Sequence, residues 1–349
     1  MEQREIPVAG WRKVVRFQDE EAGLDAIISV HDDTLGPGCG GCRMLPYPDF
    51  DAAIEDVKNL SRGMTFKNAL GGIPFGGGKS VIIADPRKDK TPELIKAFAA
   101  AVDSLEGQYY TAEDSGIAES DIELMQTVTK YAAGIGKNGV GGNPGPFTAR
   151  GIWRGMQAAA RHRFGSESLD GVKVSIVGVG SVGMALARLV HEDGGSLVVG
   201  DINAEAVKEA EERFGAVAMS PEDAAAAAVD IYAPCAFGGA INPQSLEKLQ
   251  AKVVAGAANN QLATPALGKA LKEREILYAP DYVINAMGVI SVGLEILGTW
   301  SKHELERRTD RIGETLSDIF ARADAEDRTP DEVADAMALE IIKRGRQAA

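Results

Sequence analysis

Three side chains in the first third of the sequence have the chemistry that proton transfer at a small substrate requires. Lys67 lies in GMTFKNALGG, Lys79 in PFGGGKSVII and Asp114 in YYTAEDSG. Because glycine has no side chain, the backbone around both lysines can approach a ligand closely. A lysine that is held away from water and near a second cation can exchange its proton near neutral pH, and a carboxylate can act as a base. We therefore predict a site in which one lysine holds a substrate carboxylate while the other lysine and the aspartate move protons.

These residues also have an ordinary explanation, in which the lysines are solvated and Asp114 caps a helix. A third interpretation starts from the ending GGGKS, which is similar to a phosphate-binding loop. The motif GxxxxGK[ST] requires a glycine five residues before Gly78, where this chain has Ile73. We therefore expect no site for a nucleoside triphosphate in this segment.

The cysteines allow a second kind of site to be weighed. Cys39 and Cys42 have the spacing of a redox pair or of half a zinc site, while Cys235 and the four histidines are scattered singly. A structural zinc needs four ligands, and three cysteines are too few for a disulfide framework. We expect small buried thiols and no metal site.

A dinucleotide-binding pattern begins at residue 172. The apolar run VKVSIVG is typical of a strand, GVGSVG has the spacing GxGxxG, and a helical pattern follows. In such a unit the first glycine allows a tight turn, the second lets backbone approach a pyrophosphate, and the third lets the helix pack on the strand. The N–H groups at the start of the helix then face the phosphates. The cofactor-binding residues predicted in this turn are Gly178, Val179, Gly180, Ser181, Val182 and Gly183.

An acidic residue supports the same interpretation. Asp201 follows the second apolar run and lies 18 residues after Gly183, where a βαβ unit places a carboxylate beside the adenosine ribose. A carboxylate accepts from a free 2′-hydroxyl and repels a 2′-phosphate, so the sequence favours NAD over NADP. The alternative is a glycine turn in some other parallel α/β unit.

The elements that position these residues follow from hydrophobic periodicity. In the first part of the chain we predict strands at 24–31 and 81–84, a glycine-rich loop between 36 and 44, and helices at 53–67, 91–102 and 119–131. After a boundary rich in glycine and proline at 134–151, we predict helices at 148–164 and 204–214, strands at 229–234, 252–258 and 276–279, and a terminal helix that begins with a capping box at 329–332. Strands and helices that alternate in this way predict a buried parallel sheet.

Length and composition set the class of protein. The chain has 349 residues, of which 45% are hydrophobic and 25% charged, and this is enough for two ordinary globular domains. We place them at 1–145 and 146–328, with a helix at 329–349 that could pack back on the first. A net charge of −14 without a basic cluster argues against nucleic-acid or anionic-membrane binding. With no apolar run near about 18 residues, we expect a soluble, cytoplasmic protein.

Several stretches together are similar to one family. They are GGCRM, GMTFKNALGGIPFGGGKS, DPRKDK, YYTAEDSG, GNPGPFTARG, DIYAPCAFGGAIN, AGAANNQL and APDYVINAMGVI. In this order, over nearly the whole chain, they resemble the Glu/Leu/Phe/Val dehydrogenases, above all the leucine and phenylalanine branch. The resemblance implies an α/β fold of two domains, an N-terminal substrate and catalytic domain and a Rossmann-type NAD-binding domain, with the active site in the cleft between them.

The resemblance also implies a reaction and roles for residues. The reaction is reversible oxidative deamination of an L-amino acid with NAD and water to a 2-oxo acid, ammonium and NADH. Lys67 matches the lysine that grips the substrate α-carboxylate, and Lys79 matches the catalytic lysine that activates water and polarises the carbonyl. Asp114 matches the carboxylate that handles protons at the amino nitrogen. The other matched residues are Gly40, Gly41, Met64 and Asn285 on the substrate side and Asn259 on the nicotinamide side.

Which amino acid is the substrate depends on a few matched positions. Val289 and Val292 match the paired valines that line an aliphatic pocket in leucine dehydrogenases, and the lack of an extra cation there disfavours glutamate. Cys39, Met287 and the tail ILGTWS depart from leucine dehydrogenases, the tail being more similar to phenylalanine dehydrogenases. Since one methylene changes specificity by only about 1–3 kcal/mol, we expect leucine and other branched-chain amino acids, with phenylalanine as the alternative.

Two other classes of protein fit the dinucleotide pattern. A non-catalytic dinucleotide sensor would be expected to lack Lys67, Lys79 or Asp114, and all three are present. A hydroxy-acid dehydrogenase on the same fold would need a base such as a histidine with a carboxylate partner, and no histidine lies in such a motif. By resemblance we also expect a homo-oligomer whose partners are a small amino acid or 2-oxo acid and ammonium.

Overall fold

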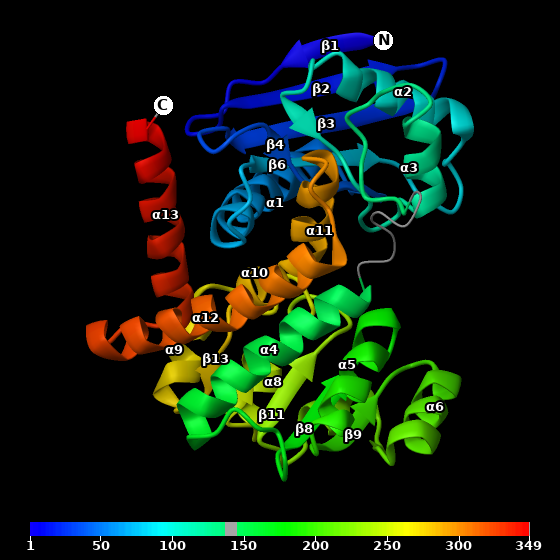
Figure 1. Cartoon of the computed structure of the whole chain (residues 1–349). Helices are drawn as coiled ribbons and strands as arrows, with labels where there is room; N and C mark the ends of the chain where they lie inside the picture. The colour runs from blue at the N-terminus through cyan, green and yellow to red at the C-terminus, as the bar shows by residue number, and fades with distance from the viewer. Residues whose placement is uncertain (137–144, 349) are drawn as a thin grey trace. The chain divides into compact units, whose positions relative to one another are not determined.

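The computed structural model describes residues 1–136 and 145–348, which form two compact units (Figure 1). Unit 1 comprises Met1–Asn143, Val289–Ser301 and Ala338–Ala349, and unit 2 comprises Pro144–Gly288 and Lys302–Met337. The chain therefore leaves unit 1 and returns to it twice. The domain limits predicted from the sequence, 1–145 and 146–328, stay predictions. Part of the predicted glycine-rich boundary, residues 137–144, lies outside the described residues.

Unit 1 is built on a mixed seven-stranded sheet in the order β1-β2-β3-β6-β4-β7, with β5 paired to β6. The strands are β1 (Glu2–Glu5), β2 (Lys13–Asp19), β3 (Leu24–Asp32), β4 (Gly38–Cys39), β5 (Cys42–Leu45), β6 (Gly76–Ile83) and β7 (Tyr109–Tyr110). Strands β1 and β2, β2 and β3, and β3 and β6 pair antiparallel. Strands β4 and β5 pair in parallel with β6, and β7 pairs in parallel with β4. The predicted strand at 24–31 is confirmed as β3. The segment predicted as a glycine-rich loop instead contributes β4 and β5, which flank Gly40 and Gly41.

The strand that carries Lys79 is longer than its apolar residues suggest. It was predicted to begin at residue 81, but β6 begins at Gly76 and includes three consecutive glycines. A Cβ on Gly77 would collide with Thr65 of helix α1 (Phe50–Leu70), so glycine lets the helix lie directly on the strand. Consequently both lysines lie on regular elements, Lys67 on α1, as the helix predicted at 53–67 implies, and Lys79 on β6.

The helices of unit 1 begin where their caps predict. Thr91 is the N-cap of α2 (Pro92–Asp103), and its side chain accepts from the N–H of Leu94. Helix α3 (Glu119–Met125) ends earlier than the predicted 119–131. The buried faces of α2 and α3 share a core with β2 and β3 that includes Phe17, Ile28, Phe98 and Ile122. This core holds β6 and the segment that carries Asp114 in place.

Unit 2 contains a parallel six-stranded sheet in the order β10-β9-β8-β11-β12-β13, as the alternating pattern predicted. Its strands are β8 (Lys173–Val177), β9 (Ser196–Gly200), β10 (Val217–Ala218), β11 (Ile231–Pro234), β12 (Val253–Val254) and β13 (Leu277–Tyr278). Its shorter helices are α5 (Ser181–Glu192), α6 (Ala204–Phe214), α7 (Pro221–Ala225), α8 (Pro243–Lys248), α9 (Ala266–Glu273) and α10 (Asp281–Ile284). Strand order reverses between β8 and β11, the switch point where doubly wound sheets bind ligands.

Four further helices complete the chain: α4 (Gly145–Phe164), α11 (Met287–Ile296), α12 (Lys302–Glu326) and α13 (Pro330–Ala348). The predicted capping box is present, since the N–H of Glu332 donates to Thr329 Oγ1 and the N–H of Thr329 donates to Glu332 Oε2. The last part of α13 belongs to unit 1, where Arg346 Nη2 lies 2.5 Å from Asp32 Oδ2. Among the helices that the structure describes, none combines the length and apolar character that a membrane span requires.

Candidate active site

The structure of unit 1 brings Lys79 and Asp114 together. Lys79 is only 5% exposed on β6, and its Nζ donates to Asp114 Oδ2. Asp114 lies after β7, where its Oδ1 accepts from the N–H of Ser115 at 2.5 Å. A buried ammonium with a carboxylate partner is the arrangement in which a proton can pass between two side chains and a substrate. The alternative of a solvated Lys79 is therefore wrong.

The charges around Asp114 keep it ionised. Burial by itself raises the pKa of this carboxyl, but the nearby charges of Lys79 and Arg43 and the hydrogen bonds from Lys79 and Ser115 outweigh burial and hold the pKa well below its usual range. Asp114 is therefore a carboxylate near neutral pH.

The backbone at Gly40 and Gly41 lies against these two groups. A Cβ on Gly40 would collide with the carbonyl of Gly78 and lie 2.9 Å from Met64 Cγ. A Cβ on Gly41 would collide with the carbonyl next to Asp114 and lie 3.0 Å from the Asp114 Cβ. Only glycine fits at either position. Gly40 lies against Met64 and the backbone that precedes Lys79, and Gly41 lies against Asp114.

Helix α1 places Met64 and Lys67 three residues apart, on the same face, and both are half-buried. The next residue, Asn68, is fully buried, and its Nδ2 donates to the carbonyls of Cys39 at 3.1 Å and Gly76 at 2.7 Å. This side chain ties the end of α1 to both β4 and β6. It thereby holds the helix that carries Lys67 against the strand that carries Lys79.

The valines expected to contact the substrate side chain belong to unit 1. A Cβ on Gly134 would lie 3.2 Å from Val292 Cγ2 and 3.6 Å from the Cβ of Ala112, two residues before Asp114. Val289 lies one turn earlier on α11, and both valines are half-buried. The helix is anchored by Ile290, which lies 3.2 Å from where a Cβ on Gly71 would be. The two valines therefore share a helix face, and Val292 lies near the segment that leads to Asp114.

The glycine turn of unit 2 has the geometry of a dinucleotide-binding unit. Gly178 has a φ of +99°, and a Cβ on Gly183 would collide with the Gly178 carbonyl. Gly180 is the N-cap of α5 and has no side-chain cap, and no atom of another described residue outside its chain neighbours lies within 4 Å of where its Cβ would be. The N–H groups of Ser181, Val182 and Gly183 begin the helix there. A pyrophosphate fits this terminus because backbone N–H groups and the positive end of the helix dipole lie there.

Asp201 ties this turn to the end of β9. Its Oδ2 accepts from the N–H of Val179 at 2.7 Å and its Oδ1 accepts from the N–H of Asn203 at 2.8 Å. Each carboxylate oxygen can accept a second hydrogen bond, so both remain able to bind ribose hydroxyls.

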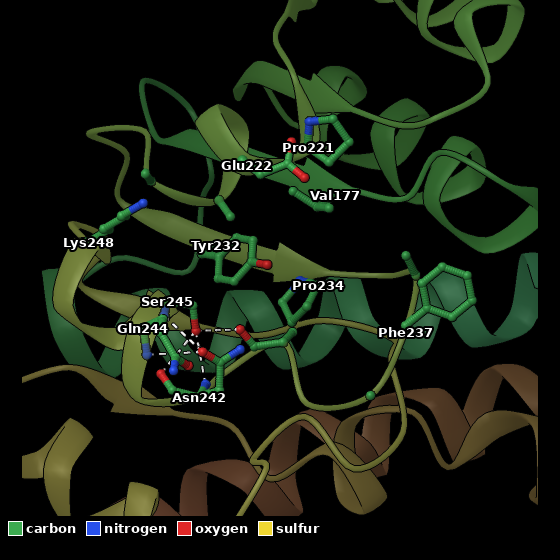
Figure 2. A pocket seen from close by; sticks show the side chains of 15 residues that line it. Val177, Pro221, Glu222, Tyr232, Pro234, Phe237, Asn242, Gln244, Ser245 and Lys248 are labelled. Carbon is green, nitrogen blue, oxygen red and sulfur yellow. Dashed lines mark hydrogen bonds between the residues drawn. The ribbon is translucent and has the colours of Figure 1, made fainter.

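A pocket of about 370 Å³ borders the turn (Figure 2). Val177, Pro221, Tyr232 and Pro234 give it apolar walls, and Glu222, Asn242, Gln244 and Lys248 bring polar groups to it. Ala236, which also lines the pocket, is the residue that a Cβ on Gly178 would meet, with its N at 2.7 Å. The size and the apolar walls suit a flat aromatic ring such as a nucleobase.

Asn259 and Asn285 hydrogen bond to each other within unit 2. Asn285 is 5% exposed, and its Nδ2 donates to the carbonyl of Ala257 at 3.0 Å and to Asn259 Oδ1 at 2.9 Å. The buried Asn285 Oδ1 has no hydrogen-bond partner among the described residues. The sequence assigned one asparagine to the cofactor and the other to the substrate, whereas the structure makes them one polar group with a spare acceptor.

Three site residues were missed in the sequence. Arg43 lies next to Asp114, Asn68 anchors α1, and the Tyr109 hydroxyl donates to the carbonyl of Gly40 at 2.7 Å. Arg43 and Asn68 each lie within a stretch that carried the family resemblance, and a charged or amide side chain inside a glycine-rich stretch was the available signal. Tyr109 carried no such signal, because a tyrosine in a short strand is ordinary core.

The cysteines of unit 1 are part of its core. Cys39 and Cys42 are fully buried, and burial raises the pKa of each thiol to about 12. They are therefore protonated thiols, as expected of small core residues.

The whole chain is similar to known amino-acid dehydrogenases. A sequence model of the Glu/Leu/Phe/Val dehydrogenase dimerisation domain matches residues 12–131, and one of the Glutamate/Leucine/Phenylalanine/Valine dehydrogenases matches residues 141–347. Leucine dehydrogenase of Geobacillus stearothermophilus is 46% identical over 97% of this chain and 92% of its own length. Leucine dehydrogenase of Bacillus subtilis is 49% identical over 85% of this chain and 82% of its own length.

A solved structure agrees with the sequence comparisons. The crystal structure of L-tryptophan dehydrogenase from Nostoc punctiforme superposes with a TM-score of 0.84 at 39% identity, covering 97% of each chain. The two family matches together span most of the sequence, and the fold, the glycine turn and the Lys79–Asp114 pair are all present. The chain belongs to the Glu/Leu/Phe/Val dehydrogenase family.

Proposed function

We propose that this protein is an NAD-dependent dehydrogenase that reversibly deaminates a hydrophobic L-amino acid, with leucine and other branched-chain amino acids as its main substrates. The observation that carries the proposal is the buried Lys79–Asp114 pair, packed against the backbone of Gly40 and Gly41. The reaction converts the amino acid, NAD⁺ and water to a 2-oxo acid, ammonium, NADH and a proton.

In unit 1, different residues bind the substrate carboxylate and transfer protons. Lys67 holds the substrate carboxylate through a charge-assisted contact. Asp114 accepts a proton from the substrate ammonium, because the nitrogen must be neutral before a hydride can leave Cα. Lys79 takes a proton from the water that attacks the imino carbon, and its charge then stabilises the oxygen of the resulting carbinolamine.

The residues of unit 2 fit a dinucleotide. The terminus of α5 at Gly180 would hold the pyrophosphate, Asp201 the ribose, and the pocket beside Val177 and Ala236 the adenine. The spare acceptor of Asn285 suits a carboxamide N–H. When bound, NAD supplies the hydride acceptor. We propose NAD rather than NADP because the charge of Asp201 disfavours a 2′-phosphate.

The proposed substrate class rests on Val289 and Val292. Two residues that depart from leucine dehydrogenases are packed in cores, which weakens the case for phenylalanine. Met287 contacts Thr309 Oγ1 through its sulfur at 3.6 Å in unit 2, and Cys39 is fully buried in β4. The tail ILGTWS still favours phenylalanine, which we keep as the second candidate.

We also propose that the enzyme is a cytoplasmic homo-oligomer. The description of the matched N-terminal region as a dimerisation domain supports assembly. All three cysteines are free thiols, as a reducing compartment favours. Light scattering during size-exclusion chromatography measures the assembly directly, and a mass equal to one chain would contradict it.

The test is NADH formation with a panel of L-amino acids at alkaline pH. We expect turnover with leucine, valine or isoleucine, weaker turnover with phenylalanine, and a loss of about 1,000-fold or more in kcat for Lys79→Ala, within the range that acid–base catalysis contributes. A non-catalytic sensor would bind NADH without turnover. NADH formation from hydroxy acids but from no amino acid would overturn the proposal.

A further inference from the structure

Arg43 is a second cation in the active site of unit 1. It lies on β5, next to the strand that carries Lys79, and its side chain is only 16% exposed. Its Nη1 lies 3.2 Å from Asp56 Oδ2, on helix α1, and the same oxygen accepts from the Tyr47 hydroxyl at 2.6 Å. Asp56 and Tyr47 thus hold one end of the guanidinium in place.

The other part of the guanidinium faces Asp114. Arg43 Nε lies 3.8 Å from Asp114 Oδ1, is buried, and has no hydrogen-bond partner among the residues that the structure describes. Asp114 therefore has Lys79 at one oxygen and Arg43 near the other. A small rotation of the carboxylate would convert the long ion pair with Arg43 into a hydrogen bond.

The chemistry of the proposed reaction requires a second cation here. Lys79 must be neutral at the step in which it accepts a proton from water, and Asp114 then loses its closest counter-charge. Burial alone raises the pKa of a carboxyl, so Asp114 would tend to keep a proton at that moment. Arginine does not lose its proton in proteins, so Arg43 supplies a charge that is constant while the charge of Lys79 changes.

We propose that Arg43 is a positioning residue whose permanent charge keeps Asp114 ionised and oriented while Lys79 exchanges its proton. The assignment rests on the proposed dehydrogenase function and adds a residue to its machinery. The charged and titratable groups that act on Asp114 are Lys79, Arg43, Cys42, Tyr47 and Glu113, and Asp56 acts on Arg43. Of the two cations in this set, Arg43 alone cannot take part in proton exchange.

A purely structural role is the alternative, since Arg43 also joins β5 to α1 through Asp56. The experiment separates charge from packing by chemical rescue. Arg43→Ala is assayed for leucine deamination with methylguanidinium and with methylurea, which has a similar shape and no charge. Thermal unfolding and NADH binding by fluorescence report whether the variant has folded.

We expect kcat of Arg43→Ala to fall by about 100-fold, at the low end of acid–base effects, with little change in KM for leucine. Methylguanidinium should restore activity, and methylurea should not. The acid limb of kcat/KM should move to higher pH, because losing a positive charge favours the protonated form of every neighbouring group. Arg43→Lys should keep part of kcat because it keeps the charge.

The matched control is Arg16, whose Nε and Nη2 donate to the two carboxylate oxygens of Asp25 at 2.8 and 2.6 Å. Arg16 lies on β2 of the same sheet, and β3 lies between β2 and β6. Arg16→Ala should keep kcat and show no rescue. Equal rescue of Arg43→Ala by both additives, or an unchanged pH profile in a folded variant, would overturn the assignment. A wild-type enzyme without amino-acid turnover would instead overturn the proposed function, so the two failures are distinguishable.

Discussion

The two ligand sites of this chain are built in opposite ways. In unit 2 the glycine turn, the N-terminus of α5 and Asp201 all lie within one βαβ segment, and the hydrogen bond from Val179 to Asp201 lies within that segment. In unit 1 the Lys79–Asp114 pair, the backbone at Gly40 and Gly41, and α1 come from segments that are far apart in the sequence. A local site can be recognised from spacing, whereas a site assembled from distant strands cannot.

The two sites also differ in how substitutions should affect them. Around Gly180 a ligand surface is left open, while the backbone of Gly41 is enclosed by protein. Substitutions in unit 1 should therefore affect catalysis and folding together. Substitutions at the surface of the turn in unit 2 should affect cofactor binding alone.

The largest effect is expected at the long-range site. Asp114→Asn keeps the shape of the side chain and removes the base, so kcat should fall by about 100- to 10,000-fold. Steady-state kinetics measure this loss, and NADH fluorescence titration should give an unchanged Kd. A weakened Kd with normal kcat would show that Asp114 serves the cofactor instead.

The second prediction compares two glycines. Gly41→Ala places a methyl group against the Glu113 carbonyl, and overpacking of this kind costs about 1–3 kcal/mol. Urea unfolding should show this loss of stability together with reduced kcat. Gly180→Ala places a methyl group where no atom of another described residue outside its chain neighbours lies within 4 Å, so it should unfold at the same urea concentration and bind NADH more weakly. Equal stability loss in both variants would remove the distinction between the two sites.

A third prediction concerns cofactor choice. Asp201→Asn removes the charge that favours a ribose hydroxyl. A hydrogen bond to a charged group contributes about 1.5–3 kcal/mol, which is the upper limit of the expected loss. The Kd for NADH should rise by about tenfold, and the preference for NADH over NADPH should narrow. Isothermal titration with both cofactors gives the ratio, and kcat at saturating NAD should stay near the wild-type value. An unchanged ratio would mean that another residue selects the cofactor.

The smallest expected effect is on stability in acid. The pKa of Asp114 is lower in the folded protein than the ordinary value of about 3.9. The group therefore contributes stability above about pH 3.9, and this contribution is lost as the pH falls further, through the folded pKa. Urea unfolding between pH 3 and 6 should show a steeper loss in the wild type than in Asp114→Asn. Identical slopes would mean that the ion pair adds nothing to stability.

Much of unit 2 could be predicted because its signals are periodic and local. The apolar runs, the GxGxxG spacing and the capping box at Thr329 each depend on neighbouring residues. The strands β11, β12 and β13 are shorter than predicted. Strand β11 begins two residues later than predicted, and apolar residues such as Ala255 and Ile276 lie outside the paired residues of β12 and β13.

Unit 1 was harder to predict because glycine occurs both in loops and in closely packed strands. The same glycine-rich composition that suggests a loop also allows strands β4 and β6 to pack closely on neighbouring elements. The site residues Arg43, Asn68 and Tyr109 were missed for a related reason. Their importance depends on which carbonyl or carboxylate they reach, and the partners Asp114, Cys39 and Gly40 lie 71, 29 and 69 residues away in the chain.

The sequence by itself determined the class of fold, the dinucleotide turn with Asp201, and the kinds of side chain that would carry out proton transfer. Those features depend on residue type and on short spacings along the chain, which can be identified without a structure. Only the tertiary structure decided that Lys79 is buried against Asp114, that Arg43 lies on its other side, and that Val292 belongs to the same unit. Each of these is a contact between distant segments, and such contacts exist only after the core has brought the strands together.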